Sequence, residues 1–82
     1  MTDQIMEAFL NVERAMENYN NVLNDYVTTL HSQENSDSTK LERMKAGTRA
    51  MRDSSGIYLS YAKFVAYGMP ESEDLIEDDL QA

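Results

Sequence analysis

Few residues in this chain have the types and spacing that chemistry requires. There is no cysteine, and His31, the one histidine, is followed three residues later by Glu34, a pair that could contribute two ligands to a metal ion. Glu13 and Glu17 have the spacing of carboxylate ligands in helical bundles, but no Glu-x-x-His motif accompanies them. Neither pair is a complete ligand set, so we predict no metal and no cofactor.

Catalytic arrangements are also missing from the sequence pattern. The chain offers no Ser–His–acid combination, no glycine-rich phosphate loop and no pair of carboxylates in an apolar setting. We therefore predict that the protein is not an enzyme.

Five basic residues lie within one short stretch: Lys40, Arg43, Lys45, Arg49 and Arg52. On a helix, Lys45, Arg49 and Arg52 would share one face and could bind an anion such as phosphate. The alternative is that they pair with acidic side chains of this chain. The net charge of −8 disfavours free binding to a nucleic-acid backbone, and five tyrosines at helical spacings suit packing better than base stacking.

The segment from Glu71 to Ala82 has six acidic residues and no basic one. Its aliphatic residues could form an amphipathic turn on contact with a partner. The candidate docking residues are Leu75, Ile76, Leu80, Glu73, Asp74 and Asp78. The alternative is a solubilising tail that binds nothing.

The elements that must position these residues are defined by two heptad series. The first comprises Ile5, Phe9, Val12, Met16, Tyr19, Leu23, Tyr26 and Leu30. Alternating steps of four and three residues keep one stripe of a helix against a partner. We predict a helix over 3–32, with Thr2 or Asp3 as its N-cap.

The second series has the same spacing but a weaker centre. It comprises Leu41, Met44, Thr48, Met51, Ser55, Tyr58, Ala62, Val65 and Met69. After a polar linker over 33–38, Thr39 and Glu42 form a predicted capping box that opens a helix over 39–68. Gly68 and Pro70 are expected to end that helix.

Two interpretations of this second helix remain open. It is continuous, or it breaks near 53–56, where Gly56 lowers helix propensity, and the fold becomes a three-helix bundle. A continuous helix is favoured because the heptad spacing continues unchanged through residues 53–56.

Two long helices joined by a short linker predict an all-α antiparallel hairpin over 1–69, followed by an acidic tail over 70–82. Residues 1–32 carry five acids and one base, whereas 41–69 carry five bases and two acids, which favours their pairing. We expect Leu30 to lie near Leu41, and Ile5 near Val65 or Met69.

A hairpin of this size has too few neighbours for residues 57–67, which are apolar over more than half of the helix circumference. We therefore predict a homodimer in which two hairpins form a four-helix bundle. The expected interface residues are Met6, Phe9, Leu10, Tyr61 and Phe64.

For function, the sequence predicts a small acidic helical adaptor or inhibitor, of the kind found in bacteria and phages, that binds another protein. One alternative is a nucleic-acid mimic that presents the acids of the first helix, and a second is a nucleic-acid-binding hairpin that uses the basic strip. With no apolar run of membrane-spanning length and no signal-peptide pattern, we expect a cytoplasmic protein without membrane or nucleic-acid partners.

Overall fold

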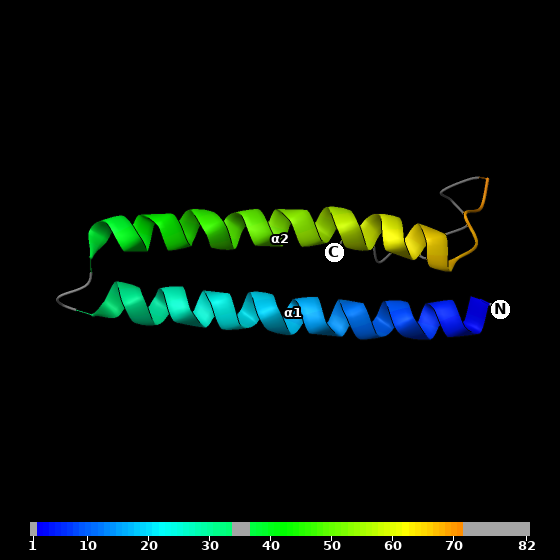
Figure 1. Cartoon of the computed structure of the whole chain (residues 1–82), viewed down its shortest axis with the longest axis horizontal. Helices are drawn as coiled ribbons and strands as arrows, with labels where there is room; N and C mark the ends of the chain where they lie inside the picture. Colours follow the sequence, from blue (N-terminus) through cyan, green and yellow to red (C-terminus); the bar gives the residue numbers. More distant parts are fainter. Residues whose placement is uncertain (1, 34–36, 72–82) are drawn as a thin grey trace.

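Two long helices make up the described part of the chain. The computed structural model describes residues 2–33 and 37–71. Helix α1 spans Thr2–Ser32 and helix α2 spans Ser38–Ala66, and they lie side by side and antiparallel (Figure 1). The predicted all-α hairpin is confirmed for these residues. Glu34 and the candidate docking residues between 73 and 80 lie outside the described residues.

Helix α1 begins at Thr2, inside the stretch expected to cap it. It contains no Gly or Pro across 31 residues, so nothing in it interrupts the backbone ladder. In its last turn, the Ser32 hydroxyl donates to the Thr29 carbonyl at 2.9 Å. This bond satisfies one of the carbonyls that a helix C-terminus leaves unpaired.

The start of α2 corrects one sequence expectation. Asp37, rather than Thr39, is the N-cap, and its carboxylate accepts the backbone N–H groups of Thr39 at 2.9 Å and Lys40 at 3.4 Å. The predicted capping box of Thr39 and Glu42 is therefore wrong. A carboxylate satisfies two exposed N–H groups and also carries the charge that the positive helix end favours.

Helix α2 continues without a break through residues 53–56, which decides between the two interpretations in favour of one helix. A Cβ added to Gly56 would meet nothing within 4 Å, so this glycine is a propensity cost and not a point of close approach.

At the C-terminal end of α2, Gly68 takes φ +87°, and its N–H donates to Val65 at 2.9 Å. The N–H of Met69 donates to Phe64 at 3.0 Å. This Schellman geometry ends the helix at Ala66, two residues before the predicted end.

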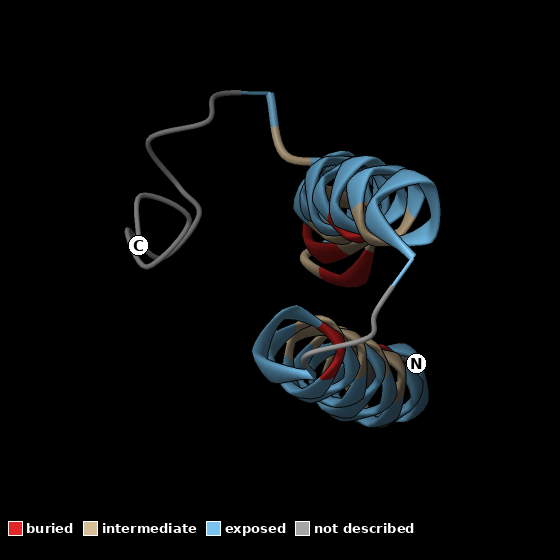
Figure 2. Cartoon of the chain, turned by 90° about the vertical axis from the view of Figure 1, so that its left-hand side faces the viewer, coloured by how far each residue is buried: buried red, intermediate tan, exposed pale blue. Residues whose placement is uncertain are grey.

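The two helices meet along a narrow strip. Buried and half-buried residues lie on the facing sides of α1 and α2 (Figure 2). In the described part of the chain, the buried hydrophobic side chains are those of Phe9, Leu30 and Ala66. So small a core is expected of two helices without a third neighbour.

Polar contacts set the register of the hairpin. The Asn20 side chain donates to the Ser55 hydroxyl at 3.0 Å, and the Arg52 guanidinium donates to the Asn24 side chain at 2.9 Å. These pairs are one helical turn apart on α1 and match an antiparallel alignment. We refer below to the linker end, where α1 leads to α2, and to the open end, where α1 starts and α2 finishes.

The contact surface of α1 is rotated away from the predicted heptad stripe. Phe9 and Leu30 are buried, but Ile5, Tyr19 and Tyr26 from the same series are 41–53% exposed. Val12, Met16 and Leu23 of the series are half-buried, and so are four residues beside it that are spaced by seven: Met6, Glu13, Asn20 and Val27. One partner helix covers only a narrow stripe, and the Asn20–Ser55 bond draws the polar side of the series inward, so three of the eight predicted positions remain outside the contact.

Candidate functional site

Exposed and half-buried apolar residues of both helices, some of them from the heptad series, lie on one side of the hairpin and form its candidate site. We call this surface the apolar face. Its members are Ile5, Ala8, Val12, Tyr19, Val22 and Tyr26 of α1, and Met51, Ile57, Tyr58, Tyr61 and Val65 of α2. Its most exposed large hydrophobic side chain is Ile57, at 75%.

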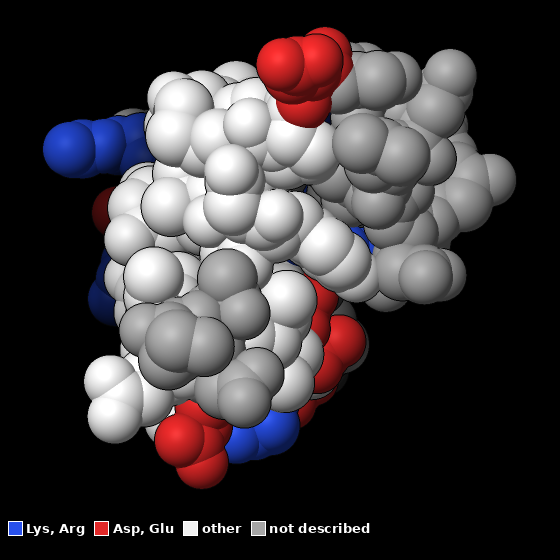
Figure 3. All heavy atoms as spheres, turned by 90° about the vertical axis from the view of Figure 1, so that its right-hand side faces the viewer, with Lys and Arg blue, Asp and Glu red and all other residues white. Residues whose placement is uncertain are grey.

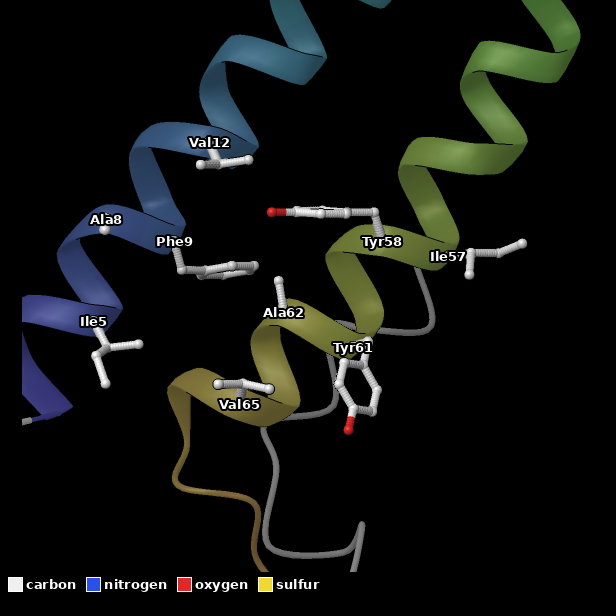
Figure 4. A pocket seen from close by; sticks show the side chains of 9 residues that line it. All are labelled: Ile5, Ala8, Phe9, Val12, Ile57, Tyr58, Tyr61, Ala62 and Val65. Atoms are coloured by element: carbon white, nitrogen blue, oxygen red, sulfur yellow. The ribbon is translucent and has the colours of Figure 1, made fainter.

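At the open end, the apolar face contains a hollow of about 450 Å³. It is lined by Ile5, Ala8, Phe9, Val12, Ile57, Tyr58, Tyr61, Ala62 and Val65. Phe9 and Tyr58 project into the space between the helices, whereas Ile57 and Tyr61 point away from α1 along the flank of α2 (Figure 4). Ile5 and Val65 line the same hollow, as the predicted pairing of the two ends requires.

A second hollow of about 340 Å³ occupies the middle of the apolar face. Its lining residues are Met16, Tyr19, Asn20, Met51, Ser54, Ser55 and Tyr58. Tyr58 lines both hollows, so the two are neighbours on this face. None of the described residues that line them carries a charge. An uncharged surface of this length is typical of protein interaction sites.

Toward the linker end, the surface becomes basic. A third hollow is lined by Asp37, Thr39, Lys40, Arg43 and Met44. The Lys40 ammonium lies 5.8 Å from the centroid of the Tyr26 ring, a cation–π distance. Lys40 therefore connects this hollow to Tyr26, a member of the apolar face.

The opposite side of the hairpin is polar. Asn24 and Arg52 form their hydrogen bond there, and Glu17 is exposed. Of the proposed anion-binding strip, Lys45 and Arg49 are exposed. Because Arg52 already donates to Asn24, the strip offers an anion fewer free donors than its spacing suggests.

The predicted interface residues occupy several environments. Phe9 is buried, while Met6 and Phe64 are half-buried. Tyr61 is exposed, with its ring 5.8 Å from that of Phe64. Leu10 is exposed, but its helical position places it on the side of α1 away from the apolar face.

Two polar features of the contact between α1 and α2 were not predicted from the sequence. Asn20 lies beside the heptad series and was not predicted to contact α2. Its spacing of seven residues from both Glu13 and Val27 is the signal that could have identified it. The Oδ1 of Asn20 and the hydroxyl of Thr48 are buried with no hydrogen-bond partner in the described part of the chain. Thr48 belongs to the second series, where we expected only weak packing.

Within residues 2–33 and 37–71, no group of three or more His, Asp or Glu side chains is placed to hold a metal ion. Neither described helix has an apolar stretch long enough to cross a membrane. Comparison with models of known protein families, with curated proteins and with solved structures gave no match. The argument for function therefore depends on the surface itself.

Proposed function

We propose that this protein is a non-enzymatic protein–protein interaction module that binds through its apolar face. The observation that supports this proposal is the length of that face, which runs from Ile5 and Tyr61 at the open end to Tyr26 near the linker. An adaptor or inhibitor of the bacterial or phage kind would use such a surface to engage a cytoplasmic protein partner.

The energetic case depends on the exposed side chains. Covering a large apolar side chain stabilises a complex by about 1.5–3 kcal/mol, and Ile57, Tyr58 and Tyr61 are each more than half exposed. Because the intrachain core is small, a partner on this face would stabilise the fold as well as form the complex.

We further propose that the hairpin works as a homodimer, with two hairpins forming a four-helix bundle. The exposed members of each heptad series, such as Tyr19 of α1 and Tyr58 of α2, support this arrangement. In such a bundle each helix packs against two neighbours, and both helices here present apolar residues on two adjacent sides.

A pair of matched substitutions tests the proposed binding face. Ile57→Asp places a charge on the apolar face, and Leu10→Asp makes the same kind of change on the opposite side of α1. We expect Ile57→Asp to weaken association at least tenfold, about 1.4 kcal/mol, as measured by affinity capture from the native host with quantitative mass spectrometry and by sedimentation.

Leu10→Asp should retain the captured partners and the assembly state. If Ile57→Asp keeps both while Leu10→Asp loses them, binding occurs on the other side of the hairpin and the proposal fails.

A further inference from the structure

We propose that the apolar face receives an amphipathic α-helix of another protein, which packs along α1 and carries acidic residues where it reaches the linker end. The inference rests on the proposed function, since it names the kind of partner for that same surface. A second heptad seam on α1 and the charge beside it support it.

Helix α1 has a complete heptad series on the side that packs against α2. Every member of this contact seam is buried or half-buried, and the members are Met6, Phe9, Glu13, Met16, Asn20, Leu23, Val27 and Leu30. Steps of three and four residues are those of a helix that packs along one neighbouring helix. The contact with α2 therefore occupies one seam of α1.

A second series with the same spacing lies one residue earlier at every position. We call it the outer seam, and it comprises Ile5, Ala8, Val12, Ala15, Tyr19, Val22, Tyr26 and Thr29. Val12 is half-buried, the other seven members are exposed, and none of the eight carries a charge. One residue corresponds to about 100° around a helix, so a helix on the outer seam would leave the contact with α2 intact.

The side chains of the outer seam suit a helix as the occupant. Ala8 and Ala15 alternate with larger members of the seam. The small side chains let a neighbouring backbone approach, and the large ones fill the space beside it. From Ile5 to Thr29 the seam is about 36 Å long, which is the length of a helix of about 25 residues.

The same helix would also contact α2. The two hollows of the apolar face are each lined by residues of both helices, so they lie along the groove between α1 and α2. A helix on the outer seam would fill this groove and cover Met51 and Tyr58, which are exposed. Burial of these side chains adds to the stability of the complex.

The charge near the linker indicates what this helix must carry there. The Lys40 ammonium lies 5.8 Å from the centroid of the Tyr26 ring, a member of the outer seam, and Lys40 shares a hollow with Arg43. Asp37, which also lines that hollow, already accepts two backbone N–H groups. A helix that covers Tyr26 removes water from Lys40, which costs free energy unless a carboxylate takes the place of that water.

Charge also favours another protein over a second copy as the occupant. A second copy would present its own outer seam, which has no carboxylate. At the open end, both acidic and basic side chains lie at the rim of a mostly uncharged surface (Figure 3), so neither sign predominates there. The requirement for an acid is therefore specific to the linker end. Because both occupants need the outer seam, binding of the partner helix should separate a dimer of hairpins.

Two synthetic helical peptides of about 25 residues test the inference on the full chain. They share an apolar seam of Leu and Ala, and one carries Glu in its first and last turns where the other carries Lys. We expect the acidic peptide to bind about tenfold more tightly at low salt, with a smaller difference at high salt. The net charge of −8 favours the basic peptide at long range, so this ranking requires a local basic site. Calorimetric titration measures both affinities, and sedimentation should show one peptide per chain.

Charge reversal locates that basic site. Lys40→Glu combined with Arg43→Glu should reverse the preference, so that the basic peptide binds more tightly. Lys45→Glu combined with Arg49→Glu changes the net charge equally on the polar side and should retain the preference for the acidic peptide. An equal effect of the two pairs would overturn the requirement for an acid at the linker end.

A second pair of variants locates the seam. Ala15→Asp places a charge in the middle of the outer seam, and Asn21→Asp adds the same charge on the polar side of α1. Both positions are exposed, and circular dichroism checks that both variants keep their helices. Ala15→Asp should weaken binding of the acidic peptide at least about tenfold, whereas Asn21→Asp should leave it nearly unchanged. Binding that survives Ala15→Asp would overturn the outer seam as the site.

The remaining outcomes separate this inference from the proposed function. If neither peptide binds but Ala15→Asp breaks up a dimer of hairpins, a second copy occupies the outer seam, so the inference fails and the proposed homodimer stands. If neither peptide binds and Ile57→Asp still abolishes capture of another protein, the inference fails and the interaction module stands. If Ile57→Asp affects neither capture nor assembly while the acidic peptide binds as described, the inference holds for α1 and the contribution of Ile57 to the proposed function is wrong.

Discussion

At the residue scale, Asp37 shows how one carboxylate defines the start of a helix. Its side chain accepts two backbone N–H groups of the first turn of α2. The sequence instead predicted a start at Thr39 and Glu42, because a capping box satisfies exposed donors by the same chemistry. Only the backbone path out of the linker decides which side chain reaches them.

Removing this cap has a defined expected cost. Asp37→Ala should lower the free energy of unfolding by about 1 kcal/mol, because the N–H groups of Thr39 and Lys40 lose their acceptor. Thr39→Ala is the control and should change stability by less than half as much. Thermal unfolding followed by circular dichroism measures both, and the opposite ranking would restore the capping box of Thr39 and Glu42.

Asn20 and Ser55 allow a similar test across the two helices. Their side-chain hydrogen bond is part-buried, so a double-mutant cycle of Asn20→Ala and Ser55→Ala should give a coupling of about 0.5–1.5 kcal/mol. Chemical denaturation of the four variants measures that coupling. Additive effects would show that the bond does not hold the register in solution.

At the element scale, the glycines of α2 differ in what they do. Gly56 lies inside the helix with open space around its Cα. Gly68 follows the helix with φ +87°, a conformation that L side chains rarely adopt. Sequence propensity alone treats both as helix breakers, whereas only Gly68 takes part in ending α2.

Alanine substitutions should therefore act in opposite directions. Gly56→Ala should raise the free energy of unfolding by about 0.5–1 kcal/mol, because the added methyl group meets no neighbour and helix propensity improves. Gly68→Ala should destabilise by about 1 kcal/mol, since the positive φ becomes strained. Urea unfolding compares the two variants, and a destabilising Gly56→Ala would indicate that another chain approaches that position.

At the scale of the whole molecule, the main feature is the mismatch between the small core and the long apolar face. Three hydrophobic side chains are buried in the described part of the chain, and marginal folds of this size usually depend on additional contacts. If association supplies those contacts, folding and assembly are linked equilibria.

This linkage predicts a concentration-dependent stability. The midpoint of thermal unfolding should rise by several degrees between about 1 and 100 μM chain, because a dimer of hairpins is favoured by mass action. Circular dichroism at 222 nm over that range measures it, with Ile57→Asp as the variant that should lose the dependence. A midpoint independent of concentration in both proteins would indicate a hairpin that is stable alone.

The sequence by itself determined two long helices, their antiparallel pairing and the apolar character of the second half of α2. These follow from local periodicity, from a short polar linker and from the absence of Pro within either helix. They depend on spacings along one chain, which the sequence displays directly.

Only the tertiary structure decided which members of each heptad series the hairpin covers. Ile5, Tyr19 and Leu30 look equivalent in the heptad pattern, yet Leu30 is buried while the other two are about half exposed. The choice depends on a rotation of each helix about its axis, set by cross-helix contacts such as Asn20–Ser55. Periodicity fixes the spacing of a stripe but not the angle at which the partner meets it.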